Sequence, residues 1–222
     1  MINHYSDLKG AALPLKIFGL MMILIGFAFA QSVEDIVEEV QEKYEGMQNF
    51  SAEFVQAEYF KITGSRNETS GKIYVKNGVQ YRLQTEDRTI ATDGITVWTY
   101  SVFNNQVLID RAKKDDGAML PRDLLFKYPH DYYASLLEAV KIGGADYYII
   151  KLDPKEETHG YIKTMKIWVK DKEYLISKIE YTDFNNNVST FEIRKVDIKK
   201  NLPDSMFQFT PPEGAEVVDL RM

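Results

Sequence analysis

The stretch Gly71-Lys72-Ile73-Tyr74-Val75-Lys76-Asn77-Gly78-Val79-Gln80-Tyr81-Arg82-Leu83 decides the fold class of this chain. On both sides of Asn77-Gly78, apolar residues recur at every second position, which is the period of a strand with one buried face. Asn-Gly is a strong hairpin signal because both residues tolerate a positive φ angle. The stretch therefore predicts two antiparallel strands joined by a tight turn.

The same period continues through most of the chain. Asp93-Gly94 marks a second tight turn, and further turns are expected at 171–173 and 185–187. The other alternating segments are 50–56, 89–92, 96–100, 148–152, 165–169, 176–181 and 191–196. Strands joined by short turns form a meander rather than a βαβ repeat. About ten such strands curl rather than stay flat, so we expect one large curved antiparallel sheet.

Three helices are expected beside this sheet. Ser32 can cap a helix with Asp35 three residues further on, and apolar residues follow at helical spacing as far as Gly46. Residues 117–142 lose the strand alternation and contain two apolar clusters, which are separated by Pro129. These features predict one helix near the start and two short helices in the middle of the chain, packed on the concave side of the sheet.

Residues 1–30 have the pattern of a secretion signal. Two lysines precede an apolar run at 17–29, which ends in the small-x-small sequence Ala28-Phe29-Ala30. The run is shorter than the ~20 apolar residues that span a bilayer. We expect cleavage after Ala30 and, in the absence of a linker or repeat, a single domain over 31–222.

Composition excludes several classes of function. The 222 residues are 45% hydrophobic and 27% charged, which is typical of a folded domain with a core. The net charge of −6 argues against nucleic acid as a partner. The chain has no cysteine, which removes disulfides, thiolate metal sites and a lipid anchor on the chain itself. His130 and His159 lack metal-ligand spacing, and no nucleophile-elbow motif is present. We therefore expect no metal, no cofactor and no catalytic residue, and the protein is not expected to be an enzyme.

The informative feature is the apolar faces of the expected strands. Such stripes either fill a packed core or line a binding cavity, and the packed core is the commoner case. The pattern of residues alone leaves both possibilities open.

The chain resembles the outer-membrane lipoprotein carrier family, LolA, across nearly all of its length after residue 30. The resemblance rests on short motifs that occur in the order of the family. They are Asn49-Phe50-Ser51-Ala52-Glu53-Phe54-Val55-Gln56, Gly71 to Lys76, Tyr81-Arg82-Leu83, Thr92-Asp93-Gly94 with Val97-Trp98 and Tyr100, Asn105-Gln106-Val107, Leu152 with Pro154-Lys155, and Phe207-x-Phe209-Thr210-Pro211-Pro212.

The resemblance implies an incomplete β-barrel, or half-barrel, closed by a helical lid. It also implies a monomeric periplasmic carrier that receives acylated lipoproteins from an inner-membrane ABC transporter and passes them to an outer-membrane receptor, without a cofactor. Burial of an acyl chain gains about 0.8 kcal/mol per CH₂, so such cargo needs an apolar shelter between membranes.

Carried over position by position, the resemblance implies two sets of site residues. The positions implied to face the acyl cavity are Phe54, Ile73, Val75, Tyr81, Leu83, Ile90, Trp98, Tyr100, Ile150, Met165, Ile167 and Ile179. The positions implied to form the lid are Leu120, Leu124, Leu125, Leu136, Leu137 and Val140.

The chain departs from the family at one position that matters. Family members have an arginine and a proline after the Val-Lys of the first hairpin, and the arginine holds the lid shut. Here Asn77-Gly78 stand in their place, with Arg82 or Arg122 as conceivable substitutes. Two alternatives therefore stay open, a carrier of a glycolipid or another amphiphile, and a lipid-sensing regulatory protein with the same fold.

Overall fold

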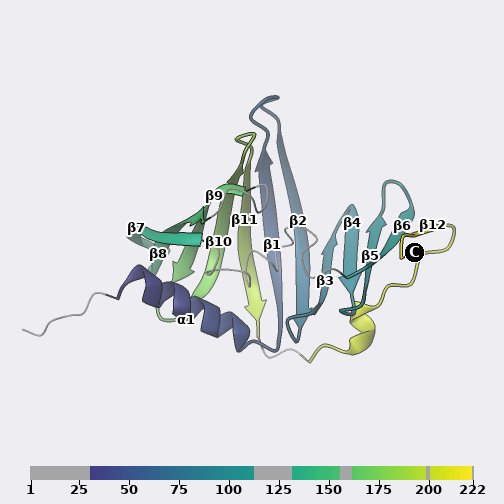
Figure 1. Ribbon diagram of the computed structural model, residues 1–222, viewed down its shortest axis with the longest axis horizontal. Helices are drawn as coiled ribbons and strands as arrows, with labels where there is room; N and C mark the ends of the chain where they lie inside the picture. Colours follow the sequence, from purple (N-terminus) through teal and green to yellow (C-terminus); the bar gives the residue numbers. More distant parts are fainter. Residues whose placement is uncertain (1–30, 113–131, 156–161, 199–200, 222) are drawn as a thin grey trace, which may run out of the picture. The chain divides into compact units, whose positions relative to one another are not determined.

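The computed structural model describes residues 31–112, 132–155, 162–198 and 201–221. All the elements in these residues belong to one compact unit, Gln31–Met222 (Figure 1). The helices are α1 (Val33–Glu45) and the short 3-10 helix η1 (Asp204–Phe207). The strands are β1 (Asn49–Tyr59), β2 (Arg66–Lys76), β3 (Gln80–Thr85), β4 (Arg88–Thr92), β5 (Thr96–Ser101), β6 (Gln106–Arg111), β7 (Tyr132–Ile142), β8 (Ala145–Pro154), β9 (Ile162–Lys170), β10 (Leu175–Asp183), β11 (Val188–Asp197) and β12 (Glu216–Asp219). The expected secretion signal at residues 1–30 lies outside the described residues.

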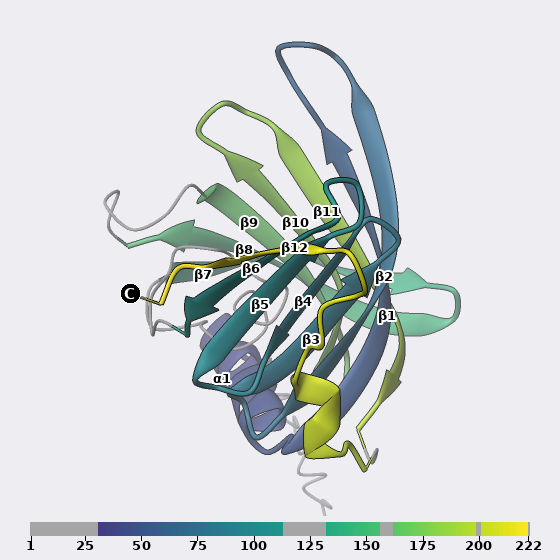
Figure 2. The ribbon, with the colours of Figure 1, turned by 90° about the vertical axis from the view of Figure 1, so that its right-hand side faces the viewer.

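The strands form a single sheet in the order β12-β6-β5-β4-β3-β2-β1-β11-β10-β9-β8-β7. Every neighbouring pair is antiparallel except β12 and β6, which are parallel. The sheet bends, as Figure 2 shows, and its edge strands β12 and β7 are not paired with each other in the described part of the chain. The expected large, curved and unclosed sheet is therefore confirmed.

The turn between β2 and β3 has the geometry that Asn-Gly favours. Asn77 and Gly78 both have positive φ angles, 51° and 67°, which match the right-handed twist of the flanking strands. The backbone N–H of Val79 donates to the carbonyl of Lys76 at 3.3 Å and closes the turn. The predicted hairpin is confirmed.

Helix α1 begins with the predicted capping box. The Oγ of Ser32 accepts from the N–H of Asp35, and the Asp35 carboxylate accepts from the N–H of Ser32. One face of the helix is buried through Ile36, Val37, Val40 and Tyr44. No helix in the described segments is long and apolar enough to cross a membrane.

The two faces of the sheet are covered by different parts of the chain. We call the face that carries Phe50, Ala52 and Phe54 of β1 the inner face, and α1 packs on it in the main apolar cluster. On the outer face lies the C-terminal segment 201–209. The guanidinium of Arg82, whose side chain is on the outer face, donates to the carbonyl of Met206 at 3.2 Å. Each face therefore has its own core.

The expected second helix of the middle segment is wrong. Residues Tyr132–Ile142 form β7, which pairs with β8 around the turn at Gly143-Gly144. The register shifts between Leu136 and Glu138, so one extra residue enters the strand there. This bulge breaks the period of two and places apolar residues at spacings that resemble those of a helix. The first expected helix of this segment, at 117–131, lies outside the described residues.

Candidate functional site

The inner face brings together ten of the twelve residues that were expected to line a cavity. Cross-strand partners point to the same face, and the register connects Ile73 to Leu83 and Leu83 to Ile90. Ile167 in β9 is opposite both Ile179 and Ile150 in the same way. The ten inner-face residues are Phe54, Ile73, Val75, Tyr81, Leu83, Ile90, Ile150, Met165, Ile167 and Ile179. Their role in binding a ligand remains a prediction.

The other two expected cavity residues, Trp98 and Tyr100, lie on the outer face, which corrects the expectation for them. Trp98 is opposite Ala91, and Ala91 is opposite Arg82, whose side chain meets the C-terminal segment. The ring of Tyr100 packs against Phe209 with 5.5 Å between the ring centroids. Both side chains are partly buried there, and the C-terminal segment contacts β5 through Phe209.

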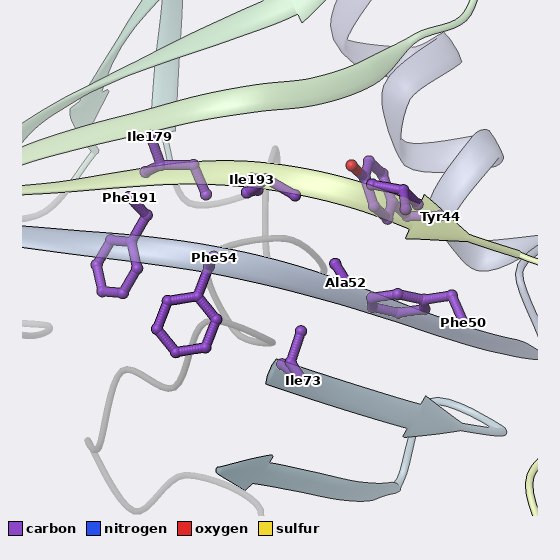
Figure 3. Close-up of a pocket in the computed structure, with 9 residues that line it drawn as sticks. Tyr44, Phe50, Ala52, Phe54, Ile73, Ile179, Phe191 and Ile193 are labelled. Carbon is purple, nitrogen blue, oxygen red and sulfur yellow. The ribbon is translucent and has the colours of Figure 1, made fainter. Parts of the chain in front are cut away.

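A narrow apolar hollow opens on the inner face beside the end of α1 (Figure 3). Its lining comes from α1 and from the four adjacent strands β2, β1, β11 and β10. The lining residues are Tyr44, Phe50, Ala52, Phe54, Ile73, Ile179, Phe191, Ile193 and Val196. Its volume is about 20 Å³. By the same measure, a cavity that holds one water needs roughly 10–15 Å³. Most of the inner face is therefore packed, and the hollow is a gap within it.

Six residues of this hollow were missing from the predicted site. Phe50 and Ala52 belong to the alternation that continues from Phe54, and that period was a signal that could have included them. The contribution of Tyr44 depends on how α1 crosses the sheet, which no local pattern reveals. The other three, Phe191, Ile193 and Val196, come from β11, which is adjacent to β1 in the sheet but far from it in sequence.

Tyr44 fixes α1 to the sheet at one end of the hollow. Its hydroxyl oxygen accepts a hydrogen bond from the backbone N–H of Ile176 at 3.0 Å, and its ring meets Phe50 edge to face. Burial raises the pKa of the Tyr44 phenol to about 12, although the hydrogen bond from Ile176 acts in the opposite direction. The phenol stays neutral at physiological pH, which suits an apolar wall.

Gly71 makes room for the Phe54 ring at the wall of the hollow. The two residues are directly opposite each other on β2 and β1. A Cβ atom at position 71 would lie 2.5 Å from Cζ of Phe54 and 2.7 Å from the carbonyl oxygen of Gln84. Only glycine lets the ring lie over the neighbouring strand in this way.

The structure describes three of the six residues that were expected to form a lid. Leu136, Leu137 and Val140 belong to the edge strand β7 rather than to a helix, and Leu136 and Leu137 are about half exposed. Their expected place in a helical lid is therefore wrong. The remaining lid residues, Leu120, Leu124 and Leu125, lie outside the described residues.

Of the two conceivable substitutes for the family arginine, Arg82 is described by the structure, and it does not lie on the inner face. Asn77 and Gly78 form the turn between β2 and β3, and Arg82 points to the outer face. There its guanidinium also lies 5.8 Å from the centre of the Phe209 ring. Arg122 lies outside the described residues.

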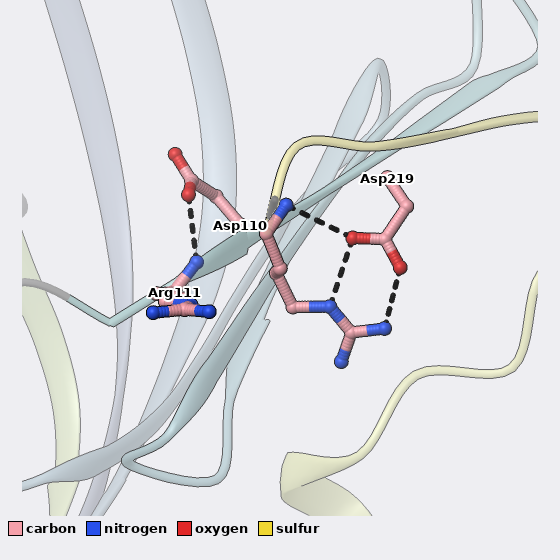
Figure 4. A network of polar contacts seen from close by, with 4 residues as sticks. Asp110, Arg111 and Asp219 are labelled. Atoms are coloured by element: carbon pink, nitrogen blue, oxygen red, sulfur yellow. Dashed lines mark hydrogen bonds and ion pairs between the residues drawn. The ribbon is translucent and has the colours of Figure 1, made fainter.

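Polar contacts close the β12 edge of the sheet (Figure 4). The guanidinium of Arg221 donates from Nε and Nη2 to the two carboxylate oxygens of Asp219, at 2.9 and 2.5 Å. These hydrogen bonds lower the pKa of Asp219 to about 2. The Asn105 side chain donates to the Gly214 carbonyl at 2.9 Å and helps to hold the strand. These groups are structural, and the described segments contain no group of three or more side chains that could hold a metal ion.

Three features define the structural class of this protein. They are an open sheet with an apolar inner face, a helix across that face and a hollow between the two. The protein has the half-barrel fold of the lipoprotein carriers. The hollow is lined by apolar side chains that contact one another by packing.

The comparison with known families agrees. Residues 45–210 match the family described as "Outer membrane lipoprotein carrier protein LolA", and the chain belongs to this family. The expected family is therefore confirmed.

Individual relatives are distant. An outer-membrane lipoprotein carrier protein of Haemophilus influenzae is 27% identical over 97% of this chain and 98% of its own length. An uncharacterized protein of Methanocaldococcus jannaschii is 24% identical over 89% of this chain, which spans 58% of the length of that relative. Among solved structures, an uncharacterized conserved protein from Thermus thermophilus has a TM-score of 0.55 and 14% identity. It covers 84% of this chain and 98% of its own, and this likeness supports the fold alone.

Proposed function

We propose that this protein is a periplasmic carrier that shelters the acyl chains of lipoproteins at the inner face of its sheet. The observation that carries the proposal is the apolar hollow between α1 and the strands β1, β2, β10 and β11. It occurs in a member of a family described as lipoprotein carriers. The cargo would arrive from an inner-membrane ABC transporter and leave to an outer-membrane receptor.

The physical chemistry of the inner face suits this cargo. Each buried CH₂ of an acyl chain contributes about 0.8 kcal/mol, and no covalent step is required to bind or release it. The lining offers hydrocarbon and aromatic carbon, and the hydroxyl of Tyr44 is already bonded to the backbone of β10. Binding through packing alone is reversible, as a carrier requires.

The hollow must widen to accept an acyl chain. A volume of about 20 Å³ holds little more than one water. In this proposal α1 is the wall that moves, because Tyr44 is the residue that α1 contributes to the lining. Widening would separate Tyr44 from Phe50 and break the hydrogen bond to Ile176.

A second candidate function is carriage of a glycolipid or another amphiphile. The observation that favours it is the Asn77-Gly78 turn, which stands where family members have Arg-Pro. The same hollow would serve, and only the head group of the ligand would differ.

The test is native mass spectrometry of the protein with detergent-solubilised triacylated lipoproteins. We expect a one-to-one complex that is lost in Ile193→Trp, because Ile193 lines the hollow and is only partly buried, so that a larger ring can fill the gap. The matched control is Val55→Trp. It adds the same ring to the adjacent strand β1, on the outer face, and should leave the complex intact.

Three outcomes would change the assignment. Binding of glycolipid but never of lipoprotein would favour the second candidate. Equal loss of the complex in both tryptophan variants would show that the hollow is not the site. The absence of any amphiphile complex would mean that the inner face is only a core.

A further inference from the structure

Two long hairpins end side by side at one end of the sheet. The β1–β2 hairpin turns at residues 60–65 and the β10–β11 hairpin at 184–187, and both project from the same end in Figures 1 and 2. The backbone N–H of Lys61 donates to Oδ1 of Asn187 at 3.0 Å and joins the two turns. We call residues 60–66 and 184–187 together the hairpin tip.

The hairpin tip exposes two large apolar side chains. Ile62 is 87% exposed and Phe184 is 55% exposed, each at the outermost part of its hairpin. Single exposed apolar residues are common on protein surfaces. Here, however, they occupy two turns that a hydrogen bond holds together, so both can enter the same apolar phase.

Cations surround these two side chains. Lys61 and Arg66 belong to the tip, and Nζ of Lys163 donates to Oδ1 of Asn186 at 3.1 Å. The tip contains no carboxylate. Asp183 directly precedes it, and both of its oxygens already accept hydrogen bonds from Asn187.

The basic tip contrasts with the rest of the chain. Glu58 and Glu68 lie further down the β1–β2 hairpin, and the protein carries a net charge of −6. The guanidinium of Arg66 stacks over the ring of Tyr59 at 5.3 Å, which keeps that cation near the tip. Apolar side chains with flanking cations are the pattern of a surface that enters the interface of an anionic bilayer.

The strands that carry the tip are the ones that line the hollow. Phe54 on β1, Ile73 on β2, Ile179 on β10 and Phe191 on β11 all belong to the hollow. Towards the tip, Tyr181 stacks on Phe191 with 6.2 Å between ring centroids and extends the aromatic surface. A bilayer at the tip would therefore lie at the end of the same four strands that line the hollow.

We propose that the hairpin tip docks on an anionic lipid bilayer, with Ile62 and Phe184 inserted among the lipids and Lys61, Arg66 and Lys163 at the head groups. This inference rests on the proposed function and adds to it a contact between the carrier and the membrane itself. The tip would align the inner face with the bilayer while an acyl chain moves between them.

The test is flotation of the Gln31–Met222 unit, which contains the whole sheet and both cores, with vesicles of phosphatidylethanolamine and phosphatidylglycerol. We expect binding that weakens with salt and is absent with phosphatidylcholine alone. The double variant Ile62→Glu/Phe184→Glu should bind at least about tenfold more weakly. Lys61→Gln and Lys163→Gln should each weaken binding about fivefold.

The matched control is Ile95→Glu. Ile95 is 77% exposed and lies in the β4–β5 turn, at the opposite end of the strands, so its replacement should leave vesicle binding unchanged. Phe184→Trp gives a direct readout, because brominated lipids should quench its fluorescence above the background of Trp98 and Trp168. Circular dichroism and thermal melting check that each variant is folded.

The outcomes separate this inference from the proposed function. Tip variants that keep the lipoprotein complex but lose vesicle binding support the inference. Equal flotation of wild type and the tip double variant would overturn it and leave the carrier function standing. The same conclusion would follow if brominated lipids quenched the Phe184→Trp variant no more than wild type. Loss of transfer to a purified receptor without loss of vesicle binding would make the tip a protein-docking surface and would also overturn it.

Discussion

The inner and outer faces of the sheet show two ways of covering the same strands. On the outer face, the C-terminal segment follows the sheet closely: Phe207 is fully buried, and Lys76 donates to the carbonyl of Leu202 at 2.9 Å. On the inner face, α1 is a rigid cylinder that meets a curved surface, and a hollow remains beside its end. A largely extended segment with one short 3-10 helix can match the surface residue by residue, whereas a straight helix of 13 residues cannot.

This difference assigns different tasks to the two faces. The outer core is closed by polar contacts of the backbone as well as by packing, which makes it a fixed part of the fold. The inner core depends mainly on apolar packing, and the backbone N–H of Ile176 donates a hydrogen bond that joins the sheet to Tyr44 of α1. The face that can open is therefore the one that α1 covers.

The largest expected effect tests whether the outer face is the more tightly filled of the two. Phe207→Ala should lower the free energy of unfolding by about 3–5 kcal/mol, because the ring is fully buried. Ile193→Ala, beside the hollow, should cost only about 1–2 kcal/mol because that side chain is partly buried. Urea denaturation measures both, and equal losses would contradict the contrast between the faces.

The next effect concerns the hydrogen bond that joins α1 to the sheet. The pKa of Tyr44 is about 12 in the folded protein and about 10 in the unfolded chain. The unfolded state releases its proton first, so the contribution of Tyr44 to stability is complete below pH 10 and falls as the pH rises to 12. Two pKa units correspond to about 2.7 kcal/mol.

The measurement is the free energy of unfolding from pH 8 to pH 12 for wild type and Tyr44→Phe. The variant should be about 1–2 kcal/mol less stable at pH 8, because the N–H of Ile176 loses its acceptor. Its stability should then fall less steeply above pH 10. Parallel curves would show that Tyr44 is not the buried phenol of the inner face.

The last prediction sharpens the description of the hollow itself. Gly71→Ala should destabilise the protein by about 1–3 kcal/mol, because its Cβ would meet the Phe54 ring and the Gln84 carbonyl. The loss should be smaller in a Phe54→Leu background, since part of the clash is with the ring. A double-mutant cycle by urea denaturation measures this coupling, and purely additive effects would contradict the proposed contact.

Local patterns predicted much of the fold and part of the site. The capping box at Ser32, the Asn77-Gly78 turn and the alternation of Ile73, Val75, Tyr81 and Leu83 each depend on neighbours within a few residues. For this reason they could be recognised without the structure. Ten of the cavity positions that the resemblance implied follow such an alternation and lie on one face of the sheet.

The errors have physical causes that act over a distance. The family resemblance implied that Trp98 and Tyr100 face the cavity, but a segment about one hundred residues further along packs on the outer face of β5. The extra residue at Leu137 changed the spacing in β7 and imitated a helix. No short window of sequence contains either cause.

The sequence by itself determined most of the strand segments, several of their turns and that the chain belongs to a family of lipoprotein carriers. Those properties follow from period, turn chemistry and motif order, all of which can be recognised along the chain. The tertiary structure decided which face each core occupies, where the hollow lies and that two distant turns meet at one tip. Those properties depend on strand order and on how α1 and the C-terminal segment pack, because β1 has β11 as its neighbour only in the folded sheet.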